Sequence, residues 1–549
     1  MSTTIGRLAP GLCLLLLLTQ VIKFFVKFYQ VRQRFQSFQK QGLPMPPHHP
    51  ILGHLLLVSK IMGTLPSDVH GHVLPNQIEQ LLPNLGSVFY LDTWPFGPPM
   101  LVVANPDACY QITQSHSLPK YHALRKYMEP MTGGKDLVTM EASEWKTWRN
   151  IFNPGFSSAH LMTLVPDILK DMSRFVERLQ EASKGSEVVR LDPMANMLSL
   201  DIICRVALDT DLNAQQGSSD FASALRRQTR WLSFGNEANL FTRYHPLRPM
   251  MQWWNARQMN QFIAQELNSR FDINHTKEKV STDRRSRTII DLALETYLSE
   301  TTPTNSSGSL DSTFQNVAIS QIRTFVFAGH DSTGSTICYA FHLVSTNPSA
   351  RRQLVDEHNR ILGPDPEQAI ARLREEPHLL KRLVFTTAVV KETLRLYPPA
   401  SSTRSGESGF NIRLSDGRQL PTAGFLVWSN SYAIHRDPVL WPQPNSFLPE
   451  RWLVEEGHDL HPVKGSHRPF EFGPRNCIGQ ELAMLEVKMV LAVTVRRFQV
   501  RSAYDEWDRL HWGNRSGSKM VNGERAYPVL DGAAHPSEGL PCRVEMIAH

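Results

Sequence analysis

One cysteine, Cys477, lies in a segment whose residue types could make a metal ligand. The segment reads Phe-Glu-Phe-Gly-Pro-Arg-Asn-Cys-Ile-Gly over residues 470–479, and its glycines permit tight turns and a close backbone approach to a flat ligand. Apolar residues then follow at helical spacing, at Ile478, Leu482, Leu485 and Met489. We therefore expect Cys477 at a helix N-terminus, where backbone N–H groups favour a thiolate. A buried, inert cysteine is the alternative for this residue alone.

A second pattern could supply protons. Asp331 is followed by two hydroxyl side chains, Ser332 and Thr333, and an acid beside a hydroxyl can relay protons to a reacting group. Phe325, Ala328 and Ser332 are spaced to share one helix face. An ordinary buried helix with a glycine kink at Gly329 is the alternative for this stretch read alone.

Two charged patterns are weaker when read in isolation. Glu392 and Arg395 are three residues apart, so they share a helix face and can pair, although most such pairs are solvated surface charges. Trp145 and Arg149 are four apart, which also fits a surface aromatic–cation pair. The helix around Arg395 should end at the Tyr-Pro-Pro sequence of residues 397–399, because proline cannot continue it.

The elements that must position these residues are mainly helical. Helical patterns dominate residues 161–298, whereas residues 87–91 and 100–103 read as strands around a turn, and further strands are expected near 410–420 and in the C-terminal tail. We expect an α+β arrangement that is mainly α-helical. The six cysteines are scattered without a CxxC pair, which argues against a disulfide framework or a structural zinc site.

The N-terminal segment predicts a membrane anchor. Residues 8–22 carry no charge and include five consecutive leucines, and the apolar stretch reaches bilayer length if Lys23 and Lys27 extend toward the headgroups. Basic residues concentrate after the apolar core, which places the body of the protein in the cytosol. A cleaved signal peptide is the rival, but no small-residue cleavage site follows Ile22.

These motifs together resemble the cytochrome P-450 family. Residues 470–479 fit the FxxGxRxCxG pattern of its haem-binding loop, residues 391–396 its K helix, and residues 325–333 its oxygen-activating I helix. The resemblance implies haem b bound through iron to Cys477, since a thiolate pushes electron density onto the iron. It also implies a set of haem-binding residues: Cys477, Arg475, Phe470, Gly473, Gly479, Trp145, Arg149, Arg404 and His435.

The same resemblance assigns roles to the other motifs. Glu392 and Arg395 would join Arg451 in a buried structural triad behind the haem loop, and a buried charge group of this kind must be fully paired. Asp331, Ser332 and Thr333 would be catalytic. The sequence departs from the family at Ser332, where threonine is usual, and serine lacks the methyl group that restricts χ1.

The implied reaction is monooxygenation of an apolar small molecule by dioxygen. No nucleotide-binding fingerprint is visible in the chain, so electrons would come from NADPH through a cytochrome P-450 reductase, with cytochrome b5 as a second candidate donor. Within the family, the sequence resembles members from filamentous fungi, many of which act in secondary metabolism. The rivals are a reductase-independent haem-thiolate isomerase or dehydratase, a non-catalytic haem protein, and a Cys–His thiol hydrolase.

The expected organisation has three parts. Residues 1–29 form a signal-anchor helix, residues 30–55 a basic and proline-rich linker, and residues 56–549 the catalytic domain. The location implied is the endoplasmic reticulum membrane, with a single span and the catalytic domain facing the cytosol. The net charge of +6, from 58 basic and 52 acidic residues, is mild for 549 residues, and no nucleic acid is expected as a partner.

Overall fold

A computed structural model describes residues 2–217, 219–232, 245–277, 287–300, 310–512 and 519–547. The helices are α1 (Ser2–Lys40), α2 (Leu55–Met62), α3 (Leu74–Leu81), α4 (Pro106–Tyr110), α5 (His122–Thr132), α6 (Ala142–Phe152), α7 (Ser158–Lys184), α8 (Leu191–Leu208), α9 (Asp220–Arg230), α11 (Arg248–Lys277), α12 (Ile289–Glu300), α13 (Ser312–Thr346), α14 (Pro348–Leu362), α15 (Ala369–Glu375), α16 (Val384–Leu396), α17 (Ser431–Ile434), α18 (Gln480–Thr494) and α19 (Tyr504–Trp512).

The strands are short and form small sheets. They are β1 (Val88–Leu91), β2 (Met100–Val103), β3 (Val189–Arg190), β4 (Ser402–Ser405), β5 (Asn411–Arg413), β6 (Gln419–Pro421), β7 (Leu426–Ser429), β8 (Phe498–Ser502), β9 (Pro528–Asp531), β10 (Ala533–Pro536) and β11 (Pro541–Met546). The largest sheet has the order β1-β2-β7-β4, and β2 and β7 run parallel within it. The expected strands at 87–91, 100–103 and 410–420 are therefore present.

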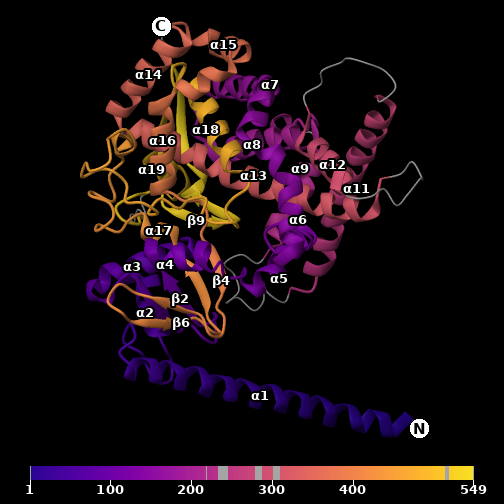
Figure 1. The fold of residues 1–549 in the computed structure, drawn as a ribbon, viewed down its shortest axis with the longest axis vertical. Coiled ribbons are helices and arrows are strands. Elements are labelled where there is room, and N and C mark those ends of the chain that lie inside the picture. Colours follow the sequence, from indigo (N-terminus) through magenta and orange to yellow (C-terminus); the bar gives the residue numbers. More distant parts are fainter. Residues whose placement is uncertain are drawn as a thin grey trace.

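The central helix is α13, which packs against α8, α16 and α18 (Figure 1). Asp311 caps its N-terminus by accepting hydrogen bonds from the backbone of Thr313 and Phe314. Most side chains of α13 are buried on every side, as expected of a helix in the middle of a large domain. The expected α+β fold with a mainly helical body is confirmed.

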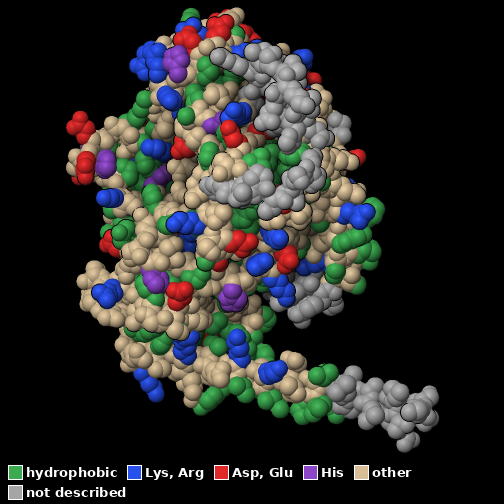
Figure 2. Space-filling model, turned by 45° about the vertical axis from the view of Figure 1, so that its right-hand side comes forward, with side chains coloured by type: hydrophobic (Ala, Val, Ile, Leu, Met, Phe, Trp, Pro, Cys, Tyr) green, Lys and Arg blue, Asp and Glu red, His purple; other side chains and the backbone are tan. Residues whose placement is uncertain are grey.

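Helix α1 leaves the body as a long arm (Figure 1). The part of this helix from Leu14 onward is long and apolar enough to cross a membrane. Its leucines at 14–18 are 53–69% exposed, and hydrophobic side chains line this arm in the space-filling view (Figure 2). A surface of this kind on an isolated helix is costly in water and suits a lipid environment.

The last part of α1 is packed into the body. Phe35 is fully buried and Val31 and Phe38 nearly so, in a core that includes strands β1, β2 and β7. Arg32 is also buried: it pairs with Asp92 and donates to the carbonyl of Trp94 at 2.9 Å. The predicted boundary between residues 29 and 30 therefore falls inside one continuous helix, and the division into three parts stays a prediction.

Candidate active site

The Cys477 loop is held in a shape that requires glycine at one position. Gly473 has φ +86, and a Cβ there would lie 2.1 Å from the backbone oxygen of Thr113, so any other residue would clash. The Cys477 N–H donates to the carbonyl of Phe470 at 2.9 Å, which closes the loop. Helix α18 begins three residues after Cys477, with Gly479 as its N-cap, in agreement with the expected helix start.

The Cys477 side chain is exposed, unlike those of Cys109, Cys204, Cys338 and Cys542, which are buried. Although the side chain is exposed, the protein that surrounds it reduces the solvation of the thiolate and raises the pKa of the Cys477 thiol, while the Gly479 N–H and the charges of Arg149 and Lys120 act to lower it. A thiol of this kind is deprotonated when it coordinates a metal ion, because the ion's charge outweighs the cost of burial.

Arginines from the loop and from α6 tie these two elements together. Arg149 donates to the backbone oxygen and the side-chain oxygen of Asn476, each at 2.9 Å. Arg475 pairs with Glu141 at 2.7 Å and lies over the ring of Trp145, 4.7 Å from its centroid. The predicted residues Trp145, Arg149 and Arg475 are thus brought together beside Cys477.

Arg404 offers two donors that lack partners. Its side chain is fully buried in β4, and one Nη donates to the carbonyl of Leu118 at 2.9 Å. The Nε and the other Nη have no hydrogen-bond partner among the described residues. Burial lowers the pKa of Arg404 to about 10. A buried cation with two free donors is suited to a carboxylate ligand, which can accept both.

Lys120 is a second cation at this place, which sequence analysis missed. Burial and, to a smaller extent, the charges of Arg404 and Arg475 together lower the pKa of Lys120 to about 7. A lysine so placed gains from an anion that neutralises the cluster. It has no motif around it, and contacts with residues distant in sequence bring it here: a β-bridge to Arg404 and hydrogen bonds to Glu141 and Ser402.

His435 is placed differently from the other predicted haem-binding residues. It is fully buried, and both ring nitrogens are occupied by the backbone: Nδ1 lies 3.0 Å from the carbonyl of Arg395, and the N–H of Arg468 donates to Nε2 at 2.8 Å. The ring therefore has no free nitrogen for a ligand. The two backbone contacts satisfy the buried ring, so no ligand is needed to explain its burial.

Ser332 and Thr333 line a pocket between α13, α16 and α18. Its other walls include Phe470 of the cysteine loop, Leu394 of α16 and Val487 of α18. The Ser332 hydroxyl donates to the carbonyl of Ala328 at 2.7 Å, so its lone pairs remain able to accept. Three hydroxyl-bearing residues, Ser332, Thr333 and Thr336, and the apolar Phe470 thus line one space beside the cysteine loop.

Asp331 does not line this pocket. Its carboxylate accepts from the backbone N–H of Ala533 at 2.6 Å and lies 3.1 Å from Nε2 of His535. Both partners belong to β10, at the far end of the sequence. The three predicted catalytic residues are adjacent in sequence, but Asp331 is turned toward β10 while Ser332 and Thr333 line the pocket.

The Glu392, Arg395 and Arg451 side chains meet in a fully buried cluster. Arg395 donates to both carboxylate oxygens of Glu392, at 2.9 and 2.7 Å, and Arg451 lies 3.3 Å from the same carboxylate. Backbone carbonyls accept the remaining hydrogen bonds of Arg395. The pattern EXXR, weak by itself, thus coincides with a dense ion-pair network on α16.

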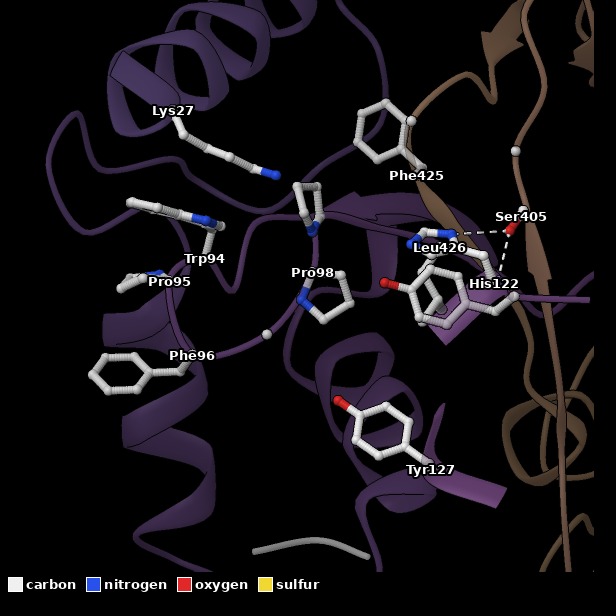
Figure 3. A pocket seen from close by; sticks show the side chains of 15 residues that line it. Lys27, Trp94, Pro95, Phe96, Pro98, His122, Tyr127, Ser405, Phe425 and Leu426 are labelled. Carbon is white, nitrogen blue, oxygen red and sulfur yellow. Dashed lines mark hydrogen bonds between the residues drawn. The ribbon is translucent and has the colours of Figure 1, made fainter. Parts of the chain in front are cut away.

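A separate pocket of about 340 Å³ lies where α1 meets the body. Figure 3 shows Lys27 on one side and the side chains of Trp94, Phe96 and Tyr127 around it. His122 lies within hydrogen-bond distance of the Ser405 hydroxyl at its edge. None of the predicted site residues lines this pocket, so it is distinct from the space beside the cysteine loop.

The fold and these contacts fit the class of haem-binding oxidoreductases: a cysteine that is accessible, unlike the other cysteines whose burial the structure describes, lies in a glycine-shaped loop, with buried cations beside it and a hydroxyl-bearing central helix nearby. The chain belongs to the cytochrome P450 family, whose sequence profile matches residues 43–522. It is a monooxygenase family of oxidoreductases that use haem.

Several relatives are similar over nearly their whole length. Cytochrome P450 monooxygenase polC of Polytolypa hystricis is 41% identical, with 97% of this chain and 95% of that protein covered. Cytochrome P450 monooxygenase acrF of Aspergillus aculeatus is 33% identical, with 88% and 99% covered. Human cytochrome P450 4Z1 is 28% identical, with 89% and 90% covered.

The fold comparison agrees. The crystal structure of the cytochrome P450DA heme domain superposes with a TM-score of 0.70 at 20% identity, covering 92% of this chain and 97% of that one. The family and fold class expected from the sequence are therefore confirmed, and the two relatives of 41% and 33% identity are fungal, as expected.

Proposed function

We propose that this chain binds haem b with Cys477 as the iron ligand and inserts one atom of dioxygen into an apolar organic substrate. The balanced reaction takes one substrate, one dioxygen, one NADPH and one proton, and yields hydroxylated or epoxidised product, water and NADP⁺. The observation that carries the proposal is the accessible Cys477 thiol in its glycine-shaped loop, whereas Cys109, Cys204, Cys338 and Cys542 are buried.

The residues around the loop fit a porphyrin with two carboxylate arms. Arg404, with its two unpartnered donors, and Lys120, with its pKa lowered to about 7 by burial, would each gain from a propionate. Arg475, Arg149 and Trp145 would complete this side of the site. Phe470, Gly473 and Gly479 would shape the loop. When bound, the haem supplies oxygen activation, tuned by its thiolate ligand.

The residues of α13 would manage protons and space. Ser332 and Thr333 present hydroxyls to the pocket, where they can accept and donate protons. Asp331 would be the acid that supplies them, although its carboxylate is turned toward β10. The apolar surroundings would exclude bulk water and favour an apolar substrate.

Electrons would come from NADPH through a membrane-bound cytochrome P450 reductase, with cytochrome b5 as an alternative second donor. Helix α1 would hold the protein in the endoplasmic reticulum membrane by a single span, with the body in the cytosol. The fungal relatives support a tailoring step in secondary metabolism for this chain.

The decisive experiment is the carbon monoxide spectrum of the reduced full-length protein. A thiolate-ligated haem shifts the Soret band far to the red, and Cys477→Ala should abolish that shifted band. Cys542→Ala is the matched control, because Cys542 is buried in β11 and should leave the band in place. A shifted band that survives Cys477→Ala would overturn the ligand assignment. Turnover without NADPH and reductase would instead support an isomerase or dehydratase.

A further inference from the structure

A buried histidine joins two acids behind α13. The ring of His535, in β10, lies 2.7 Å from Asp192 through Nδ1 and 3.1 Å from Asp331 through Nε2. Asp192 opens α8, and Asp331 belongs to α13. The three side chains are only 3–11% exposed, so their charges are poorly screened by water.

His535 is the only cationic partner of these acids in the part of the chain that the structure describes. No Lys or Arg there makes an ion pair with Asp192 or Asp331. The other contacts of Asp192 are neutral: the amide of Asn196 at 3.3 Å and the thiol of Cys338 at 3.9 Å. Two buried carboxylates without a cation would be unfavourable, so the imidazole is needed in its protonated form to pair with them.

The hairpin β9–β10 is built around the Asp331 carboxylate. Gly532, at its turn, has φ +91, and a Cβ there would lie 2.5 Å from Asp331 Oδ2. The hydroxyl of Ser335, one turn further along α13, donates to the carbonyl of Ala534 at 2.6 Å. These two contacts fix where the hairpin packs on α13. In this arrangement the Asp331 carboxylate points away from the pocket and toward the hairpin.

We propose that His535 is a positioning residue for Asp331: as an imidazolium shared with Asp192, it holds the Asp331 carboxylate on β10, beside the pocket that Ser332 and Thr333 line. This inference rests on the proposed function, because it assumes that Asp331 supplies protons there. Asp331 then shares a hydrogen bond with His535 and keeps one orientation on β10.

The charges around His535 agree with this role. Burial alone lowers the pKa of His535, but Asp192 and Asp331 outweigh that effect and raise it well above its ordinary value. The remaining titratable groups that face it are Asp531 of β9, whose pKa burial raises, and His70, whose pKa burial lowers to about 4. His70 is therefore neutral near pH 7 and does not compete for the acids.

The first test measures the charge by unfolding, independently of turnover. A histidine whose pKa is raised by folding stabilises the protein fully below its unfolded pKa of about 6.5 and loses that contribution as pH rises through the folded pKa. The gap in thermal midpoint between the holoenzyme and His535→Gln should therefore be largest near pH 6 and shrink toward pH 9.

The matched control is His358→Gln, which has the opposite sign. His358 is also buried and bonds the Thr386 hydroxyl at 2.9 Å, but burial lowers its pKa to about 3. Its contribution grows up to about pH 6.5 and then stays constant. A gap for His535→Gln that follows the His358→Gln pattern would show a neutral His535 and overturn the proposal.

The second test measures positioning. Full-length protein in phosphatidylcholine vesicles with NADPH–cytochrome P450 reductase is assayed for hydrogen peroxide released per NADPH oxidised, between pH 6 and 9. Misplacing a proton donor should change this share by about twofold or more in His535→Gln and alter its pH profile, while His358→Gln matches the wild type. An unchanged share and profile would overturn the positioning role.

The outcomes separate this inference from the proposed function. If the wild type shows no red-shifted carbon monoxide band, the proposed function fails, and the unfolding test still reports the charge of His535. If His535→Gln does not fold, Asp192→Asn removes only one of the two acids. Its stability gap should shrink with rising pH in the same way, and a gap that grows would overturn the proposal.

Discussion

Two buried charge triads of opposite composition lie in this protein. On α16, one acid, Glu392, is shared by two arginines, Arg395 and Arg451. Behind α13, one histidine, His535, is shared by two acids, Asp192 and Asp331. The first triad carries a net positive charge at every accessible pH, because arginine does not deprotonate in proteins. The second contains histidine, the side-chain type whose ordinary pKa lies near neutrality, with its pKa raised here by the two acids.

The difference separates a structural site from a site that can exchange protons. In the arginine triad, the backbone oxygens of residues 435, 444 and 446 accept the spare donors of Arg395. Those of residues 442 and 443 accept from one Nη of Arg451, so backbone carbonyls fix both guanidinium groups. In the histidine triad, each bond involves a group that can gain or lose a proton. The comparison predicts that the first triad governs folding, while the second governs the state of Asp331.

The largest effect is expected from breaking the arginine triad. Glu392→Gln leaves two buried guanidinium groups without their anion and should cost about 3–5 kcal/mol. We expect loss of most haem-loaded protein, measured by the carbon monoxide spectrum and by denaturant unfolding.

The control for that change is Glu357→Gln. Glu357 is equally buried, but its partners are neutral donors, the backbone N–H groups of Phe385 and Thr386 and the Thr386 hydroxyl. Its loss should be smaller, about 1–3 kcal/mol. Equal costs for the two variants would mean that the arginines do not distinguish the Glu392 site.

An intermediate effect is expected from Gly532→Ala. The new Cβ would meet the Asp331 carboxylate at a residue with φ +91, and the strain should cost about 1–3 kcal/mol. Gly417→Ala is the matched control: its φ is +86, but no atom lies within 4 Å of the new Cβ. Comparing the thermal midpoints of the two variants separates the contact with Asp331 from the backbone strain that both share. Equal losses would show that the contact with Asp331 adds no cost of its own.

The smallest effect is expected from Ser332→Thr, which restores the residue usual in the family. Ser332 lines the pocket and is not fully buried, and stability should change by less than about 0.5 kcal/mol. Because threonine restricts χ1, we expect less hydrogen peroxide per NADPH than in the wild type. More peroxide would indicate that serine is the better hydroxyl beside this Asp331.

Local motifs predicted most of the site, and long-range contacts supplied the rest. The cysteine loop, the end of α16 before Pro398 and the helix face of α13 follow from residue spacing, because each depends on neighbours in sequence. His535 and Lys120 could not be found in this way. Each joins the site through partners distant in sequence, such as Asp331 for His535 and Arg404 for Lys120.

His435 shows the opposite limit of sequence reasoning. Its place in the chain suggested a contact with a haem propionate, yet both of its ring nitrogens bond to backbone groups of residues 395 and 468. Which atoms of a buried histidine remain free depends on the packing around it, and no local pattern encodes that.

The docking of α1 has a consequence for how the protein would meet a bilayer. Because Arg32, Phe35 and Phe38 join the helix to the body without a break, the angle between them is fixed by packing. A flexible tether would let the body turn freely above the lipid. Here, a thinner or thicker bilayer that tilts the span would tilt the whole enzyme by the same angle, so membrane thickness would set which face of the body lies against the headgroups.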